Sequence, residues 1–526
     1  MMLFPTNTRQ VRVLFAQAVA ALAVAALVAG CGDNYRPVVT PVNSSGPPAQ
    51  PSSYTIVVSS TGTTTPGVVT MIDYSGDSVL NETPIGPGPT AFTLDEVGVT
   101  GYTVNSDRTL SNFGITTSLQ AKNVSFSTLP TSAEPVNLMA PSSGLWVTDL
   151  NGNVVDLFAN SPEAFQRAIP MSISVAPGSP TVATMPVMIT GSPSGTGQRQ
   201  YVVNQDVTDP MACNTSPKTA PTGVIIPIET ASDTTDPAIP AGKCPVFEVQ
   251  SADAQRLFVL NRGDDTVTVI NSKNNTPDSC TPFQNQNGQW ITCHPVIQLP
   301  AGSGPVFAQF NQATQQLVVS NYDGGSISVI DVTLDEYGND SNTYANANCL
   351  APSATVSTYA ACGAITGGFG TTFTISVGNT AKPEPASLTV LYDGSKAYTA
   401  NQNDDSGTGN GTVTVVNLST HTVEKTLTVV GHPRMIVSTQ NSEYSKVYTG
   451  SPDSPYVTVI ESSPSIIDLI DTSILVEGHV VDLRVTTQNG STGTVNFSSR
   501  VPGYGSPCNL PAAASLASLA TCQAQP

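Results

Sequence analysis

The sequence predicts an all-β protein: a single β-propeller of seven or eight four-stranded blades, with eight favoured. Three observations predict this fold. Only 11% of the 526 residues are charged, while Gly and Pro number 42 each, a mixture that suits short strands joined by turns. A two-strand pattern recurs along the chain. Its last copy is followed by one extra strand, and its first copy lacks one, so that the two ends can pair and close a ring.

The first 30 residues have the character of an export signal and are set apart from the fold. Arg9 and Arg12 supply positive charge, and residues 13–28 are apolar. The segment ends in Val-Ala-Gly before Cys31, which resembles the lipobox of bacterial lipoproteins. That resemblance implies cleavage of the signal peptide, acylation of Cys31 (palmitate included) and a stable membrane anchor. The alternatives are a transmembrane anchor or an ordinary cleaved signal.

Residues 31–53 are rich in Pro, Ser and Gly and predict an extended tether. The expected location is therefore the bacterial cell envelope, outside the cytoplasm, with the outer membrane or cell surface favoured. Without the signal peptide the net charge is −21. Because such a charge repels phosphate backbones, nucleic acid is not expected as a partner.

The recurring pattern is clearest in "LFVLNRGDDTVTVIN", residues 257–271. A strand ends in Asn261, a polar turn follows, and a second strand alternates Thr and Val. The same shape recurs, strongly or weakly, in seven other places: 56–73, 102–113, 146–158, 201–206, 318–331, 398–417 and 448–461. The positions equivalent to Asn261 are Ser59, Asn105, Asp149, Asn204, Asn321, Asn401 and Ser451.

Successive copies are 44 to 80 residues apart, and a second marker runs in phase with them. This marker is a proline that opens an apolar segment before the Asn position, as tolerated at the first residue of a strand. The prolines are Pro89, Pro135, Pro180, Pro245, Pro305, Pro385 and Pro433. Each unit therefore predicts four strands, which favours a propeller blade over a solenoid repeat, whose units are usually shorter and more uniform.

The two ends of the repeat region predict ring closure. The region begins at Tyr54 with the second strand of a blade, and it ends with a lone inner strand from His479. Pairing of these two would remove both exposed sheet edges. The predicted propeller spans residues 54–490, and residues 491–526 form a C-terminal extension. Seven blades remain the alternative to eight.

The strong copies also resemble the YVTN-type β-propeller repeats of bacterial and archaeal surface proteins. The resemblance is carried by residues 258–270, 318–331 and 398–433, and it is poor between 145 and 250. It implies a propeller scaffold. It does not imply an activity, because one fold carries many functions.

Eight cysteines remain besides Cys31, and they fall into neighbouring pairs. In an oxidising compartment such pairs predict four disulfides: Cys213 with Cys244, Cys280 with Cys293, Cys349 with Cys362, and Cys508 with Cys522. The first three lie in the longest gaps between copies, so they are expected to staple insertions. Zinc is a weak alternative because no pair has CxxC spacing.

His432 and His479 are the candidate ligand-facing residues at the channel mouth. Both follow a Gly in the loop that leads to an inner strand. The alternative is that Gly-His is simply a turn repeated by duplication. No cofactor is predicted and the metal is left open; calcium is kept as an alternative for the acidic groups Asp264/Asp265, Asp335/Glu336/Asp340 and Asp404/Asp405.

Sequence motifs of enzymes are absent: the chain has no GxSxG, HExxH, P-loop or CxxCH. We therefore expect no catalytic residues and a lipid-anchored binding or interaction module, held to the membrane through Cys31, with an envelope protein or glycan as partner. Two alternatives stay open. One is an extracytoplasmic propeller enzyme, such as a lactonase or a metal-dependent oxidoreductase, and the other is a structural coat component.

Overall fold

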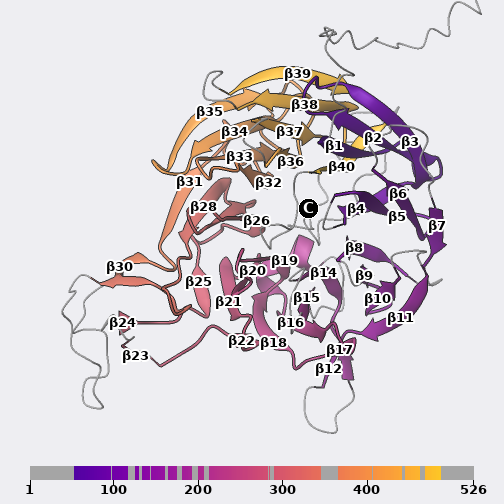
Figure 1. The fold of residues 1–526 in the computed structure, drawn as a ribbon. Helices are drawn as coiled ribbons and strands as arrows, with labels where there is room; N and C mark the ends of the chain where they lie inside the picture. The colour runs from indigo at the N-terminus through magenta and orange to yellow at the C-terminus, as the bar shows by residue number, and fades with distance from the viewer. Residues whose placement is uncertain are drawn as a thin grey trace, which may run out of the picture. The chain divides into compact units, whose positions relative to one another are not determined.

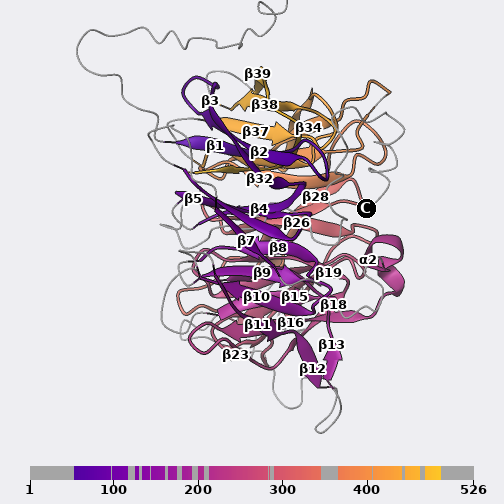
Figure 2. The ribbon, with the colours of Figure 1, turned by 90° about the vertical axis from the view of Figure 1, so that its right-hand side faces the viewer.

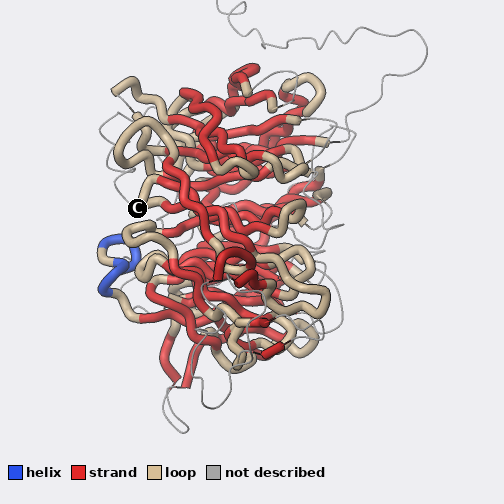
Figure 3. Tube along the Cα trace, turned by 90° about the vertical axis from the view of Figure 1, so that its left-hand side faces the viewer, coloured by secondary structure: helices blue, strands red, loops and turns tan. Residues whose placement is uncertain are grey.

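The computed structural model describes residues 53–486 except for 96–97, 116–124, 130–132, 142–143, 160–163, 175–180, 192–198, 206–211, 282, 285–289, 345–364, 406, 441–444 and 463–467. Apart from one short helix and one 3-10 turn, the regular secondary structure of these residues is β-strand, and loops connect the strands (Figure 3). No helix in this part of the chain is both long and apolar enough to cross a membrane.

Eight antiparallel sheets follow one another around a ring as the blades of a β-propeller (Figure 1). Blades 1 and 2 contain β40 (His479–Val485), β1 (Tyr54–Ser60), β2 (Pro66–Asp73), β3 (Val79–Pro87), then β4 (Pro89–Leu94), β5 (Thr100–Asn105), β6 (Thr109–Gly114) and β7 (Ser125–Thr128). Blades 3 and 4 contain β8 (Pro135–Met139), β9 (Leu145–Asp149), β10 (Val154–Phe158), β11 (Phe165–Pro170), then β14 (Pro186–Gly191), β15 (Arg199–Asn204), β16 (Thr222–Glu229), β17 (Thr234–Thr235) and β18 (Ile239–Lys243).

Blades 5 and 6 contain β19 (Pro245–Gln250), β20 (Arg256–Asn261), β21 (Thr266–Asn271), β22 (Thr276–Pro277), β25 (Val296–Gln298), then β26 (Pro305–Asn311), β27 (Gln316–Asn321), β28 (Ser326–Asp331) and β31 (Thr372–Ser376). Blades 7 and 8 contain β32 (Pro385–Val390), β33 (Lys396–Asn401), β34 (Thr412–Asn417), β35 (Thr422–Thr428), then β36 (Met435–Ser438), β37 (Lys446–Gly450), β38 (Tyr456–Glu461) and β39 (Leu469–Leu475). The predicted all-β propeller is confirmed, with eight blades.

The ring closes as predicted. The last strand, β40, pairs antiparallel with β1 and becomes the inner strand of blade 1. Beyond this pairing, the amide of Tyr54 donates to Thr486 Oγ1 at 2.9 Å, and the amide of Thr486 donates to the Tyr54 carbonyl at 2.9 Å. No blade is left with an unpaired inner edge strand, which is how a closed ring avoids sheet edges in its core.

The two sequence markers, the Pro and the Asn, lie opposite each other on the first and second strands of a blade. Pro89 pairs with Asn105, Pro245 with Asn261, and the same rung recurs in blades 3, 4, 6 and 7. In each case the register shifts directly after the proline. A residue without an N–H is tolerated there because the bulge has no ladder bond to lose.

One predicted marker is wrong. The inner strand of blade 4 begins at Pro186, which pairs with Asn204, and not at Pro180. Pro180 lies outside the described residues, between the strands of an additional hairpin, β12 (Ser172–Ser174) and β13 (Thr181–Ala183). This hairpin lengthens the connection between blades 3 and 4 and explains why the spacing from Pro180 to Asn204 was the longest of the set.

The hydrophobic core lies between the blades. Inner and second strands are buried on both faces; the inner strand β32 and the second strand β20, for example, have no exposed residue. Large apolar side chains therefore bridge neighbouring sheets, as Phe247 of blade 5 does with Phe307 of blade 6 at 4.7 Å between ring centroids. This packing explains the near-continuous apolar runs in the sequence.

Besides the β12–β13 hairpin, three further insertions lie at the rim or face of the ring. The short helix α2 (Ala212–Thr215) and the 3-10 turn Pro217–Thr219 connect β15 to β16 in blade 4. The pair β23 (Phe283–Gln284) and β24 (Trp290–Ile291) belongs to blade 5, and the pair β29 (Asn342–Tyr344) and β30 (Ile365–Gly368) to blade 6. Figure 1 places β23, β24 and β30 outside the ring, and Figure 2 shows α2 projecting from one face.

Candidate functional site

In five blades the second strand ends in an Asn, and this Asn has a structural role. Asn261 Nδ2 donates to Thr266 Oγ1 at 3.0 Å and to Thr268 Oγ1 at 2.8 Å. The same pair of hydrogen bonds recurs from Asn105, Asn321 and Asn401 to two hydroxyls of the facing strand. These amides are buried, and their hydrogen bonds offset the cost of that burial. The alternation of Thr or Ser in the third strand thus supplies acceptors for the Asn.

Of the two histidines selected from the sequence, His432 lies in the loop before the inner strand β36, and His479 is the first residue of the next inner strand, β40. The glycine before each has a positive φ, +72° at Gly431 and +80° at Gly478, which is the turn role of Gly in the Gly-His pair. His479 is buried at the start of β40. Whether either imidazole meets a ligand stays a prediction.

The imidazole of His432 lies between two carboxylates from neighbouring blades. Its Nδ1 is 2.5 Å from Asp453 Oδ2 in blade 8, and its Nε2 is 3.6 Å from Asp405 Oδ2 in blade 7. Burial alone would lower the pKa of His432, but the hydrogen bond and charge of Asp453, helped by Asp405, raise it above the usual value. His432 therefore joins the loops of two blades.

The predicted acidic groups mostly accept backbone N–H donors from neighbouring loops. Asp265 accepts from Gly302 and Gly304, and Asp404 accepts from Asn379 and Thr380. Such bonds order the loops that enter the inner strands. Within the described residues, no group of three or more His, Cys, Asp or Glu side chains is placed to hold a metal ion.

A different feature, which we call the inter-blade clamp, lies at the other end of the second strands. A cation at the first residue of the strand and a Tyr at the third both reach one buried carboxylate in the next blade. Lys396 Nζ lies 2.7 Å from Asp468 Oδ2, and the hydroxyl of Tyr398 donates to Asp468 Oδ1 at 2.5 Å. The pKa of Tyr398 is raised by burial and by Asp468.

The same clamp crosses the ring closure. Lys446 Nζ is paired with Asp77 in blade 1, and the hydroxyl of Tyr448 donates to Asp77 Oδ1 at 2.9 Å. Burial raises the pKa of Asp77, although Lys446 and Tyr448 act against that rise. The last blade is thus bound to the first by charge as well as by strand pairing.

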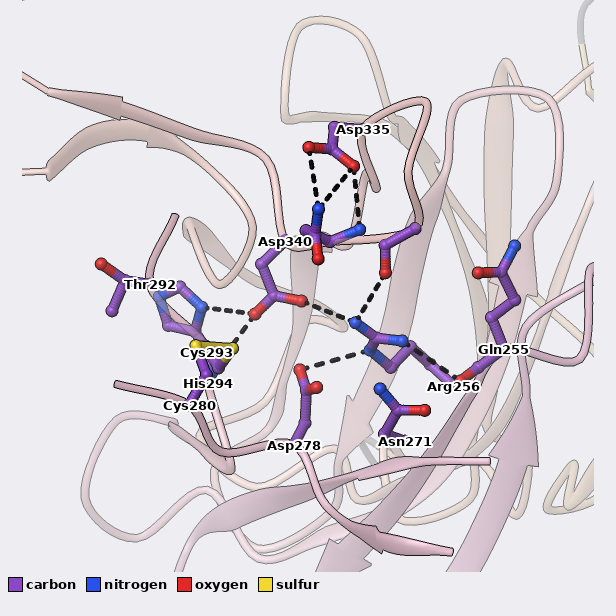
Figure 4. A network of polar contacts seen from close by, with 12 residues as sticks. Gln255, Arg256, Asn271, Asp278, Cys280, Thr292, Cys293, His294, Asp335 and Asp340 are labelled. Atoms are coloured by element: carbon purple, nitrogen blue, oxygen red, sulfur yellow. Dashed lines mark hydrogen bonds and ion pairs between the residues drawn. A yellow bond between two sulfur atoms is a disulfide. The ribbon is translucent and has the colours of Figure 1, made fainter. Parts of the chain in front are cut away.

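Between blades 5 and 6 the equivalent clamp is part of a larger network of polar contacts (Figure 4). Arg256, the first residue of β20, places Nη2 3.2 Å from Asp340 Oδ1 and donates to the Gly338 carbonyl at 3.1 Å. Its Nε lies 3.2 Å from Asp278 Oδ2. All three charged side chains are at most 3% exposed. Figure 4 shows Arg256 between the two carboxylates.

His294 completes this network on the other side of Asp340. Its Nδ1 is 2.8 Å from Asp340 Oδ2, and its backbone amide donates to the same oxygen at 3.0 Å. The ring stacks on Phe369, with centroids 5.4 Å apart. Because its side chain is 18% exposed, His294 is the one member of the charged group that reaches the surface.

Asp278 titrates near neutrality in this setting. Burial and the negative charge of Asp340 raise its pKa to about 7, against the opposing effect of Arg256. Two carboxylates beside one guanidinium hold an excess of negative charge, so protonation of one of them relieves the repulsion. The network therefore retains a proton under conditions in which an exposed aspartate is ionised.

The network joins two insertions, which we call the insertion pair: the described residues of 272–295 in blade 5 and of 332–371 in blade 6. Asp278 and His294 come from the first, and Asp340 from the second. Asn342 of the second insertion also donates from Nδ2 to the Thr292 carbonyl of the first at 3.0 Å. Outer strands still complete both blades, since β25 pairs with β21 and β31 with β28.

Two of the predicted disulfides are present. Cys213 bonds to Cys244 between α2 and the start of β19, and Cys280 bonds to Cys293 within the insertion pair. Both staple insertions, as expected. Cys349, Cys362, Cys508 and Cys522 lie outside the described residues, as does Cys31.

No family model matches the chain, and no curated protein matches it. Solved structures share the fold at low sequence identity. Dihydro-heme d1 dehydrogenase NirN is 12% identical with a TM-score of 0.51, covering 85% of this chain and 79% of its own. AztD from Citrobacter koseri is 11% identical (TM-score 0.48, 82% and 97% covered), and a candidate 6-phosphogluconolactonase from Bacteroides fragilis is 13% identical (TM-score 0.46, 84% and 99% covered). At this identity the likeness to NirN concerns the fold alone and leaves the activity open.

Proposed function

We propose that this protein is a lipid-anchored binding module of the bacterial cell envelope, and that the insertion pair on blades 5 and 6 is its recognition surface. The apolar leader, Cys31 and the Pro-rich tether support the anchor. The two disulfides support an oxidising compartment, because cytosolic thiols are kept reduced.

The observation that carries the recognition surface is the buried network around Arg256. Burial of four charged or titratable groups is costly unless their geometry is fixed by several bonds. The ring does not need this larger network, since the clamps at Asp468 and Asp77 hold their blades with a single carboxylate each. Its additional members, Asp278 and His294, fix the two insertions against each other. Loops held in one conformation bind a partner at a lower entropic cost.

The surface of the insertion pair has the side chains that recognition uses. Phe283 and Tyr337 are 38% and 42% exposed, one on each insertion. Aromatic side chains with a large exposed area are enriched at binding surfaces and bind both proteins and glycans through their flat faces. We therefore expect a protein or glycan of the envelope as the partner.

An extracytoplasmic enzyme is the second candidate, and one observation favours it. A carboxylate that accepts from Nδ1 of a histidine fixes the tautomer and leaves Nε2 as a base, and His294 with Asp340 has this arrangement. Loss of turnover in a His294→Ala variant, with partner capture retained, would favour this candidate over the binding module.

A photo-crosslinking amino acid at Tyr337 tests the recognition surface in intact cells. We expect it to capture an envelope component that the same amino acid at Val99 does not capture. Val99 is a matched control because it is 51% exposed and belongs to blade 2. Capture at both positions, or only at Val99, would contradict the proposal.

The anchor is tested separately with the Cys31→Ser variant. Labelling of cells with a palmitate analogue is expected to mark the wild-type chain and not the variant, since the acyl chains are attached at Cys31. Absence of label from the wild-type chain would exclude lipidation at Cys31.

A further inference from the structure

The two disulfides of the described chain differ in their surroundings. Cys213 and Cys244 are fully buried, at 0% exposure, and pack against Ala220. Cys280, in contrast, is an exposed residue and Cys293 is half-buried. Exposed disulfides react with thiols more readily, whereas buried ones are protected by their packing.

The exposed disulfide also lies next to two residues of the network around Arg256, so its loss would affect how they are held. Cys280 follows Asp278 by two residues, and Cys293 directly precedes His294. Asp278 and His294 are the two members of the network that come from the blade 5 insertion; Asp278 pairs with Arg256, and His294 pairs with Asp340 (Figure 4). The disulfide thus holds the two segments that carry these partners.

We infer that Cys280–Cys293 is a thiol–disulfide exchange site, open to a dithiol such as a reducing protein of the envelope, and that its reduction loosens the insertion pair. This chemistry does not depend on what the insertion pair binds. It adds to the binding module a means of changing the recognition surface without unfolding the ring.

The exchange proceeds in two balanced steps. A thiolate of the dithiol attacks Cys280 Sγ, forms a mixed disulfide with it and displaces the Cys293 sulfur as a thiolate, which takes up a proton from solvent. The second thiol of the reductant loses its proton and attacks the mixed disulfide. The reductant leaves as a disulfide, and Cys280 is released as a thiolate that is protonated in turn.

Selective reduction then removes the loop closure of residues 280–293 while the rest of the ring stays as it is. Asp278 and His294 then keep only their side-chain pairs and backbone bonds, such as Asp278 N–H to the Val269 carbonyl and His294 N–H to Asp340. The chain between them gains conformational freedom, so keeping it ordered costs more entropy. The buried Cys213–Cys244 bond, in contact with the Arg262 side chain through the Cys213 carbonyl at 3.3 Å, remains closed to the same reductant.

The test is differential alkylation of the purified full-length protein in a native buffer with a dithiol reductant. Mass spectrometry of the tryptic peptides follows each cysteine separately. We expect Cys280 and Cys293 to become alkylated at least about tenfold faster than Cys213 and Cys244, because exchange rates follow access to the sulfur. Equal rates for the two pairs, or reduction of Cys280–Cys293 only when the whole protein unfolds, would overturn the inference.

Hydrogen exchange checks the structural consequence on the selectively reduced protein. Amides at 278–280, 293–294 and 338–342 are expected to exchange faster after reduction, while those of β32 to β38 do not change. The Cys280→Ser/Cys293→Ser double variant should reproduce the same pattern without a reductant. Should this variant fail to fold, the alkylation rates of the native protein still decide. Unchanged exchange in the reduced protein would exclude loosening of the insertion pair by reduction, whatever the crosslinking result at Tyr337.

Discussion

At the residue scale, blade 3 shows what the repeated Asn does, because two aspartates replace the Asn and its hydroxyl partner found in four other blades. In blades 2, 5, 6 and 7, an Asn bonds to a Ser or Thr two rungs away on the third strand. In blade 3 these two positions are held by Asp149 and Asp156, both buried. Asp149 accepts from the amides of Glu134 and Gly152, whereas neither oxygen of Asp156 has a hydrogen-bond partner in the described structure.

This arrangement makes Asp156 a proton-binding residue. Burial, with the charge of Asp149, raises its pKa to about 7. An unfolded chain releases this proton at a lower pH than the folded protein does. Folding stability therefore falls as pH rises from the unfolded pKa to about 7 and stays reduced above it.

The Asp156→Thr variant places a hydroxyl where blades 2, 5, 6 and 7 have one. It also removes the free-energy cost of ionising a buried carboxyl group at this position. We expect the variant to raise the free energy of unfolding, by about 2 kcal/mol more near pH 8 than near pH 5. Urea unfolding at the two pH values measures the difference. The control is Asp471→Thr, at an exposed strand position, which should show a much smaller dependence. A gain that is equal at both pH values would mean that Asp156 is ionised throughout.

At the element scale, the inter-blade clamp explains how blades of variable length stay in register. Its carboxylates, Asp77 and Asp468, come from the connection between the third and outer strands, and its cations from the start of a second strand. A Tyr two residues after the cation fixes the carboxylate from a second direction. Three groups in one contact set the angle between two sheets better than apolar packing alone.

Removing only the cation of one clamp should lower the free energy of unfolding more than removing the cation and the carboxylate together. We expect Lys446→Met to lower the free energy of unfolding by about 2–3 kcal/mol, because Asp77 is left buried without its cation. The double variant Lys446→Met/Asp77→Asn should recover part of that loss. Denaturant unfolding of both, with Lys382→Met as an exposed-lysine control, measures this. A double variant less stable than Lys446→Met would show that the clamp contributes net attraction.

The elements themselves could largely be predicted from the sequence. The period-2 strands, the Pro–Asn rung and the local disulfides all depend on residues close together in the chain, so their signals are readable there. Pro180 was misplaced because an inserted hairpin changed the spacing on which the prediction depended.

The network around Arg256 could not be predicted in the same way. Arg256 and Asp340 are 84 residues apart, and His294 and Asp340 are 46 apart, so they meet only once two blades pack together. The sequence carries one signal that would have helped: a basic residue two positions before an aromatic one at the start of a second strand, as in Arg256, Lys396 and Lys446. The acidic group that included Asp340 was noted, but its partners lay in another repeat.

At the scale of the whole molecule, closure by β40 decides whether the eight blades form one unit. This strand buries Val480, Leu483 and Val485 against its neighbours and supplies the inner strand that blade 1 lacks. Without it, the inner edge of β1 and the faces of blades 8 and 2 would be exposed to solvent. Exposed edges of this kind pair with other chains.

Two truncations test this closure. A chain that stops at Gly478 lacks β40, and we expect it to elute as aggregates or to lose its cooperative thermal transition. A chain that stops at Thr486 keeps every described strand and is expected to remain folded. Size-exclusion chromatography and thermal melting followed by circular dichroism compare the two. A folded monomer from the shorter chain would show that seven inner strands suffice.

The way in which β1 enters the ring has a mechanical consequence. This strand lies between β2 and β40, and it is antiparallel to both. Hydrogen bonds in antiparallel pairs run perpendicular to the strands, so a pull on Tyr54 along the strand axis shears all of them together and does not open them one at a time. Force that reaches the ring from its N-terminal side is thereby shared over two ladders. A pull on that end is therefore resisted by both ladders at once, and the strands are expected not to separate one by one.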